Sequence, residues 1–151
     1  MPTTITSPNA QTNIPAALSD LVQAGTTALN DGDLRLALDR FEEVVAAFPD
    51  RAEGHNNLGA LYSSIGDFDK AEECFDRVIA ILPNNPNILY NRGVVRSRLE
   101  KFDLAREDFN AVLAITPHDA DTMNNLGVAS FMQGRMDEAR TIFSRTMALK
   151  P

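Results

Sequence analysis

The chain has 151 residues, of which 44% are hydrophobic and 23% are charged, and its formal net charge is −7. This length supports one domain with a buried core, and the acidic balance argues against a nucleic-acid partner because phosphates would be repelled. The single cysteine, Cys74, cannot form an internal disulfide, and no stretch approaches the roughly 20 apolar residues of a membrane-spanning helix. We therefore expect neither nucleic-acid binding nor insertion into a membrane.

The start of the chain differs in composition from the rest. Residues 1–17 carry no charged side chain and are rich in Thr, Pro, Asn and Ser, which predicts a flexible N-terminal arm. The segment lacks the basic and apolar regions of a signal peptide. The expected location is therefore cytoplasmic.

From residue 18 onward the sequence repeats with a period of 34 residues. Four residue types each recur four times in this register: Gly25, Gly59, Gly93 and Gly127; Ala37, Ala71, Ala105 and Ala139; Phe41, Phe75, Phe109 and Phe143; and Pro49, Pro83, Pro117 and Pro151. Such a period is typical of repeat architectures. It predicts one repeat domain over 18–151, made of four units at 18–51, 52–85, 86–119 and 120–151.

Each unit is predicted to contain two helices, A and B, joined by a short turn. In the second unit we expect helix A at 52–64 and helix B at 68–82, separated by Gly66-Asp67. The repeated Gly and Ala would let the two helices approach closely, and the repeated Phe would fill the space between them. Aspartates near the starts of the B helices would accept backbone N–H groups and suit the helix dipole. These aspartates are Asp33, Asp67, Asp103 and Asp137.

This pattern resembles the tetratricopeptide repeat family. The second unit carries the family pattern most fully, with Leu58, Gly59, Tyr62, Gly66, Ala71, Phe75 and Pro83. The resemblance implies an all-α fold, an α-solenoid of four helix-turn-helix repeats that forms a right-handed superhelix. It also implies a role in protein–protein interaction. The third unit departs from the pattern, because Glu100 replaces the turn glycine and Arg96 stands where the family has tyrosine.

The third unit also places two charged residues where apolar ones are usual. Position 7 of helix A, which normally faces helix B, changes from Leu58 in the second unit to Arg92 in the third. Position 23 of helix B, opposite it, changes from Cys74 to Asp108. Unpaired burial of an arginine would be costly, so we predict a structural ion pair between Arg92 and Asp108. The charged neighbours expected beside this pair are Arg96 and Glu107.

Signals of catalysis and of metal binding are weak. His55 and His118 lie far apart, and no further ligand stands at a metal-binding spacing from either. Cys74 has no base beside it in the sequence and is interpreted as a half-buried packing residue. The pairs Glu42-Glu43 and Glu72-Glu73 stand on predicted B helices and are interpreted as outer-surface residues rather than as a general acid and base. We expect no catalytic residue, no metal and no cofactor.

The family resemblance implies a concave groove lined by positions 2, 5, 6, 9, 12 and 13 of each A helix. Position 6 is a carboxamide in every unit (Gln23, Asn57, Asn91 and Asn125), and a carboxamide can pair with any peptide backbone. Direct contact with an extended peptide and a generic polar lining both remain open. The predicted partner-binding groove consists of Asn56, Asn57, Tyr90, Asn91, Val94, Arg98, Asn124, Asn125, Val128 and Phe131.

Two features of this groove allow alternatives. Arg98 is the one groove cation, and it could meet an acidic group on a partner or stay solvated. Phe131 and Met132 make the inner face of the fourth unit apolar, either as a pocket or as a surface for a further helix. The Lys and Asn clamp with which some family members hold the carboxylate end of chaperones is missing, because the first unit has Val22 and Thr26.

Charge is unevenly distributed along the repeats. Residues 18–85 carry 13 acidic and 5 basic side chains, whereas residues 86–151 carry 8 acidic and 9 basic ones. Such asymmetry can orient a partner or favour head-to-tail contact, although ordinary solvated helix faces would give the same counts.

These observations favour a non-catalytic protein–protein interaction module that binds a peptide or helical segment of a partner. One alternative is a self-assembling scaffold, a homo-oligomer formed through the C-terminal repeat or the N-terminal arm. Helix B of the last unit carries apolar residues that would favour this: Ile142, Phe143, Met147 and Leu149. The other alternative is the repeat domain of a larger enzyme, such as a protein glycosyltransferase.

Overall fold

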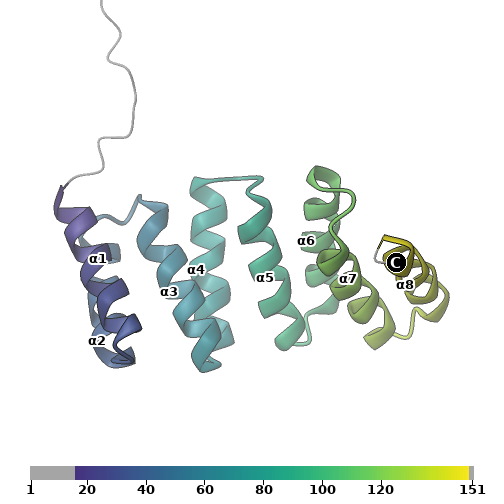
Figure 1. The fold of residues 1–151 in the computed structure, drawn as a ribbon, viewed down its shortest axis with the longest axis horizontal. Helices are drawn as coiled ribbons and strands as arrows, with labels where there is room; N and C mark the ends of the chain where they lie inside the picture. The colour runs from purple at the N-terminus through teal and green to yellow at the C-terminus, as the bar shows by residue number, and fades with distance from the viewer. Residues whose placement is uncertain (1–15, 150–151) are drawn as a thin grey trace, which may run out of the picture.

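The computed structural model describes residues 16–149. Over this range the chain forms eight α-helices and no strand, arranged as four helix-turn-helix pairs stacked in sequence order (Figure 1). The helices are α1 (Ala16–Asn30), α2 (Leu34–Ala47), α3 (Ala52–Ile65), α4 (Phe68–Ile81), α5 (Pro86–Arg98), α6 (Phe102–Ile115), α7 (Ala120–Met132) and α8 (Met136–Leu149). The predicted all-α solenoid is confirmed.

The helix boundaries lie close to the predicted ones. Helix α1 begins at Ala16, two residues before the expected start of the repeat domain, and α3 and α4 each end within one residue of the prediction. The rest of the predicted arm, residues 1–15, lies outside the described residues, as do residues 150–151.

The capping predicted for the B helices is present in two repeats and absent in a third. The side chain of Asp33 accepts a hydrogen bond from the backbone N of Leu36 at 3.0 Å, and that of Asp67 accepts one from Lys70 at 3.4 Å. Helix α6 instead follows Lys101, which makes no side-chain cap bond. Asp103 and Asp137 lie inside the first turns of α6 and α8, where their charge still suits the helix dipole.

The turn of the third repeat shows the effect of its missing glycine. In the second repeat Gly66 ends α3 in the left-handed conformation, with φ of 85°. Glu100, at the same place after α5, also adopts a left-handed φ of 58°. Because a Cβ atom makes this conformation costly, the turn geometry is retained against the preference of the residue.

The repeated glycine and phenylalanine form one packing unit in every repeat. A Cβ atom built on Gly59 would lie 2.9 Å from the Phe75 ring, and one built on Gly93 would lie 2.7 Å from the Phe109 ring. Phe75 and Phe109 are almost completely buried. The glycine therefore makes room for the ring of its own repeat, which is how helices A and B come together.

The buried core consists of two clusters that divide at α5. The first holds Phe41 and Phe75 and reaches Ile88 and Val95 of α5. The second centres on Phe109 and includes residues of the last repeat. Among residues 16–149, no helix combines the length and the apolar character needed to cross a membrane.

Candidate binding groove

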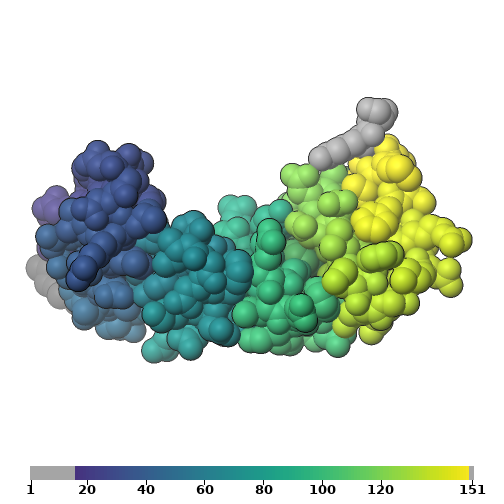
Figure 2. Space-filling model, turned by 90° about the horizontal axis from the view of Figure 1, so that it is seen from below, coloured from purple at the N-terminus to yellow at the C-terminus, as the bar shows by residue number. Residues whose placement is uncertain are grey.

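The described residues form a curved body, which is hollowed between the first and the last repeat (Figure 2). Two cavities lie where neighbouring A helices meet. We call them the α3–α5 pocket, with a volume of about 290 Å³, and the α5–α7 pocket, with a volume of about 440 Å³. Val94 of α5 lines both cavities. The predicted site thus resolves into two compartments on either side of α5.

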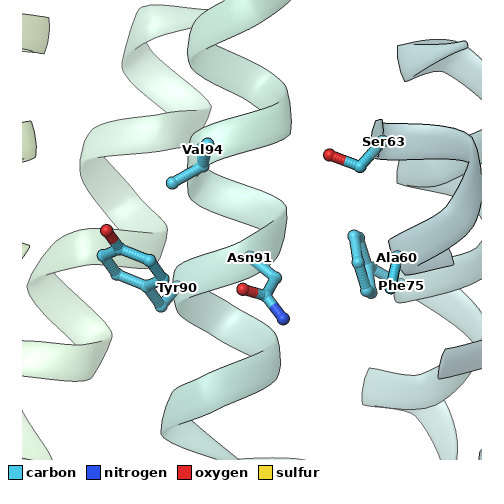
Figure 3. A pocket seen from close by; sticks show the side chains of 6 residues that line it. All are labelled: Ala60, Ser63, Phe75, Tyr90, Asn91 and Val94. Carbon is cyan, nitrogen blue, oxygen red and sulfur yellow. The ribbon is translucent and has the colours of Figure 1, made fainter. Parts of the chain in front are cut away.

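The α3–α5 pocket depends on a small side chain at position 9 of the second repeat. Ala60 stands there, whereas the third and fourth repeats have Val94 and Val128. The missing volume leaves the Phe75 ring as part of the lining. Figure 3 shows Ser63 and Ala60 on one side of the pocket and Asn91 of α5 on the other. An apolar base flanked by a hydroxyl and an amide suits a peptide unit with a small side chain.

Tyr90 also lines the α3–α5 pocket, from the opposite edge of α5 to Asn91 (Figure 3). Its hydroxyl oxygen accepts a hydrogen bond of 2.9 Å from Nδ2 of Asn125, and its ring lies 6.1 Å from that of Phe109 at an angle of 57°. Tyr90 therefore ties α5 to α7. It also uses one of the two N–H donors of Asn125, so the carboxamides of the groove are not equivalent.

The other carboxamides at position 6 of the A helices differ in whether their hydrogen-bonding groups are already used. Gln23 makes a long hydrogen bond of 3.4 Å to Thr27 within α1. For Asn57 and Asn91, by contrast, no hydrogen bond of the side chain to any of residues 16–149 is recorded, and both are half-buried. These two side chains therefore have free donors and acceptors, and Asn91 presents them in the α3–α5 pocket.

The α5–α7 pocket combines apolar walls with a charge. Its lining consists of Val94, Ser97, Arg98, Glu100, Phe102, Asn125, Val128 and Met132. Val128 is 44% exposed and Met132 is 57% exposed, and their neighbour Phe131 is 52% exposed. Within residues 16–149, one buried side-chain polar atom lacks a hydrogen-bond partner, and it is Oγ of Ser97 in this lining.

Four predicted residues are outside the linings of these two pockets: Asn56, Asn57, Asn124 and Phe131. Asn56 lines a separate cavity of about 440 Å³ at the edge between the second and third repeats, and Asn124 is exposed on α7. Sequence reasoning missed the apolar residues Ile81, Leu82 and Ile88 in the edge cavity. A signal was present, because Asn56 stands where the third repeat has the bulky Tyr90 and so leaves space.

Arg92 and Asp108, which the repeat positions place opposite each other, form a bidentate ion pair. Nε of Arg92 donates to one carboxylate oxygen at 3.0 Å and Nη2 donates to the other at 2.7 Å. Arg96 also donates to Asp108, at 2.9 Å. Glu107, expected nearby, is exposed and is not among these partners.

The further acids come instead from α4 of the preceding repeat. Arg92 donates to Asp76 at 2.7 Å, and Arg96 donates to Glu72 at 2.8 Å. Lys101 also donates to Glu72. The interpretation of Glu72 as an outer-surface residue is therefore wrong, because Glu72 is only 8% exposed. We call this set the central ion cluster: Glu72, Asp76, Arg92, Arg96, Lys101 and Asp108.

The cluster keeps its groups ionised. Burial alone would raise the pKa of Glu72, but hydrogen bonds from Lys101 and Arg96 outweigh burial and lower it. Burial likewise opposes the charge of Arg92, yet the hydrogen bonds to Asp108 and Asp76 raise its pKa. Opposite charges at hydrogen-bond distance stabilise each other, so the pKa shifts of Glu72 and Arg92 both favour their charged forms. We therefore interpret the central ion cluster as structural: its ion pairs join α5 to α4 and to α6.

The remaining titratable groups show no catalytic pairing. A ring nitrogen of His55, Nε2, lies 2.8 Å from the carbonyl oxygen of Pro49, so the side chain is engaged with the backbone. Burial raises the pKa of the half-buried Cys74 thiol to about 11, which disfavours the reactive thiolate. No group of three or more His, Cys, Asp or Glu side chains arranged to hold a metal ion was found within residues 16–149.

Comparison with known sequences gives matches along the whole repeat region. Three family models, each described as "Tetratricopeptide repeat", match residues 22–86, 58–123 and 98–151. No curated protein matches the chain in sequence.

Comparison with solved structures gives similar folds. A crystal structure of MamA is 23% identical, with a TM-score of 0.82, and the match covers 91% of this chain and 80% of that one. The structure titled "MamA 41-end from Desulfovibrio magneticus RS-1" is also 23% identical, with a TM-score of 0.84 over 89% of this chain and 76% of that one. At this identity the likeness concerns the fold.

Proposed function

We propose that this chain, which belongs to the tetratricopeptide repeat family, is a non-catalytic module that holds an extended segment of a protein partner in the groove formed by α3, α5 and α7. The proposal rests on one observation. The carboxamides of Asn57 and Asn91 lie in mid-groove with no recorded hydrogen bond to the described residues, and Asn91 borders the α3–α5 pocket. Half-buried amides without partners have hydrogen-bonding capacity to offer a peptide backbone.

The surroundings of these amides support the same function. The α3–α5 pocket is shallow and lined by small or uncharged side chains, so it can accept a backbone that passes close to α3 and α5. Tyr90 ties α5 to α7 through Asn125 and so holds the two sides of the groove at a fixed spacing. A preformed groove lowers the entropic cost of binding.

The test compares the double variant Asn57→Ala/Asn91→Ala with the wild-type chain in affinity purification from the native cell. Asn110→Ala, an exposed asparagine on α6, is the matched control. We expect a set of proteins that is retained by the wild type and by Asn110→Ala but lost from the double variant. Equal helical circular dichroism must hold for all three chains. Retention of the same proteins by the double variant would exclude the groove amides as the binding element.

A second candidate is self-association through the last repeat. Met147 of α8 is 68% exposed, whereas the residues at the same position of the earlier repeats are half-buried: Val45, Ile79 and Leu113. Met136 and Leu149 are also exposed on this helix. An exposed apolar group of this kind favours contact with a second copy.

Sedimentation velocity over a range of concentrations tests this candidate. We expect association that increases with concentration in the wild type and disappears in Met147→Glu. A wild-type chain that remains monomeric at every concentration would remove the scaffold from consideration and leave the peptide-binding proposal unaffected.

A further inference from the structure

The α5–α7 pocket differs in chemistry from the α3–α5 pocket, and the difference specifies a ligand. The α3–α5 pocket contains no charged side chain, whereas the α5–α7 pocket contains Arg98 beside a wall of apolar residues. We propose that the α5–α7 pocket selects a partner segment in which a carboxylate lies next to a large aliphatic side chain. This inference rests on the proposed function of the groove and names the chemistry of the segment it accepts.

The apolar half of the pocket provides the aliphatic specificity. Val94 and Phe102 form one part of the lining and Val128 and Met132 the other. Val128 and Met132 keep about half of their surface exposed, so an occupant would remove this surface from water. A flexible methionine at the edge adapts to leucine, isoleucine or methionine in the ligand.

The charged half provides the preference for an acid. Arg92, Arg96 and Arg106 all form ion pairs with acids of neighbouring helices. Arg98 is different, because no ion pair with any of residues 16–149 is recorded for it and its side chain is exposed. Glu100 lines the same pocket, but it also forms no recorded pair with Arg98. An incoming carboxylate would give Arg98 the charge-assisted hydrogen bonds that it lacks.

The distribution of charge favours this pocket over the rest of the groove for an acidic segment. Residues 18–85 carry a large excess of acids, with 13 acidic and 5 basic side chains. Residues 86–151, which include both α5 and α7, are nearly balanced with 8 and 9. An acidic segment is therefore repelled by the first half of the array and tolerated by the second, where Arg98 lies.

A library of random dodecapeptides displayed on phage tests the inference on the full chain. Selection is carried out in parallel on the wild type, on Arg98→Glu and on Asn57→Ala/Asn91→Ala. We expect peptides selected on the wild type to carry Asp or Glu within two residues of Leu, Ile or Met. Selection on Arg98→Glu should lose this acid and enrich Lys or Arg in its place.

One selected peptide, synthesised with its acid and with the matching amide, gives the quantitative test. The acid form should bind the wild type about fivefold more tightly than the amide form, which is the effect of one partly exposed ion pair. Arg98→Gln should abolish this difference. Glu100→Gly, which removes the competing acid from the pocket, should increase it.

The outcomes separate this inference from the proposed function. Wild-type peptides without an acidic preference, or an acidic preference that persists on Arg98→Glu, overturn the inference and leave groove binding in place. Recovery of the same peptides at the same level on the double asparagine variant contradicts the proposed function instead. Absence of enrichment on the wild type contradicts both.

Discussion

The junction between the first and second repeats and the junction between the second and third use position 11 of helix A for different chemistry. In the first junction, Tyr62 at position 11 donates one hydrogen bond of 2.9 Å to Glu42 of the preceding repeat. In the second, Arg96 at position 11 donates to Glu72 of the preceding repeat and also to Asp108 of its own. Similar backbones thus accept a single phenol at one junction and an ion cluster at the next.

The contrast extends to the pairing inside each repeat. Leu58 and Cys74 meet at positions 7 and 23 of the second repeat, while Arg92 and Asp108 meet there in the third. In the last three repeats the residues at these two positions are matched in kind, whereas the first repeat has Ala24 and Arg40 there, and Arg40 pairs with Glu43 of its own helix. A mismatch would leave a charge buried without a partner, which costs more than either matched solution.

The largest test of this comparison removes one member of the buried pair. Asp108→Ala leaves the guanidinium groups of Arg92 and Arg96 without their shared acid, and we expect the free energy of unfolding in urea to fall by about 3 to 5 kcal/mol. The double variant Arg92→Leu/Asp108→Ile introduces the pair that the fourth repeat carries as Leu126 and Ile142. The free energy of unfolding of this double variant should be within about 1 kcal/mol of the wild-type value, or higher than it. Equal destabilisation of both variants would refute the rule of matched pairs.

Replacing the repeated glycine should destabilise the second and the third repeat by a similar, smaller amount. In Gly59→Ala and Gly93→Ala, the new methyl group meets the phenylalanine ring of the same repeat at under 3 Å. Overpacking costs about 1 to 3 kcal/mol and the gain in helix propensity is about 1 kcal/mol. We expect a net loss of roughly 1 kcal/mol in each by urea unfolding. Clearly different losses would show that the ion cluster also governs packing within the repeat.

Removing the hydroxyl of Tyr62 at the first junction should lower the free energy of unfolding by less than removing the carboxylate of Asp108 at the second. Tyr62→Phe deletes one hydrogen bond to Glu42, which is itself exposed to water. We expect a loss of about 1 kcal/mol in the free energy of unfolding. A double-mutant cycle with Glu42→Gln isolates the pair, and a coupling of zero would mean that the bond does not contribute.

The stabilising contacts of Glu72 should be lost at low pH, and those of Tyr62 should be lost at high pH. The pKa of Glu72 is lowered in the folded chain, so the unfolded chain binds protons first, and this stabilisation disappears as the pH falls below 4.5 through the folded value. Burial and the bond to Glu42 raise the pKa of Tyr62 from 10.0 to about 12, so its contribution disappears as the pH rises through this interval. Urea midpoints should show that Glu72→Gln flattens only the acid limb and Tyr62→Phe only the alkaline one. A change in both limbs from either substitution would contradict these assignments.

The repeat period was sufficient to predict the fold and much of the central pair. Glycine, alanine and phenylalanine recur because helices A and B meet at the same positions in each repeat. The spacing of these residues therefore predicts the stacked helix pairs. Arg92 and Asp108 could be matched because both lie in one repeat. Glu72 could not be placed, because its partner Arg96 belongs to the next repeat and reaches back across the junction. Grouping Glu72 with Glu42 is wrong, because the two residues stand at different positions of their repeats, and the position of Glu72 faces the next repeat.

The candidate groove likewise contains contacts between repeats that the repeat period does not predict. The A-helix positions predicted its residues, but the period gives Asn57, Asn91 and Asn125 the same environment. Tyr90 breaks this equivalence, since it binds Asn125 and leaves Asn91 without a recorded partner. The small volume of Ala60, which opens the α3–α5 pocket, is visible in the sequence only once the facing ring of Phe75 is known.

The main packing contacts join consecutive helices, and weaker ones join α5 to α3 and to α7. Helices α4 and α5 therefore have neighbours on both sides, whereas α1 and α8 are the outer helices of residues 16–149. In such a linear array the outer helices open first, and backbone amides there exchange with deuterium fastest. Asn91, Val94 and Arg98 all belong to α5. The proposed binding surface consequently lies on a helix that we expect to stay folded while the outer helices open.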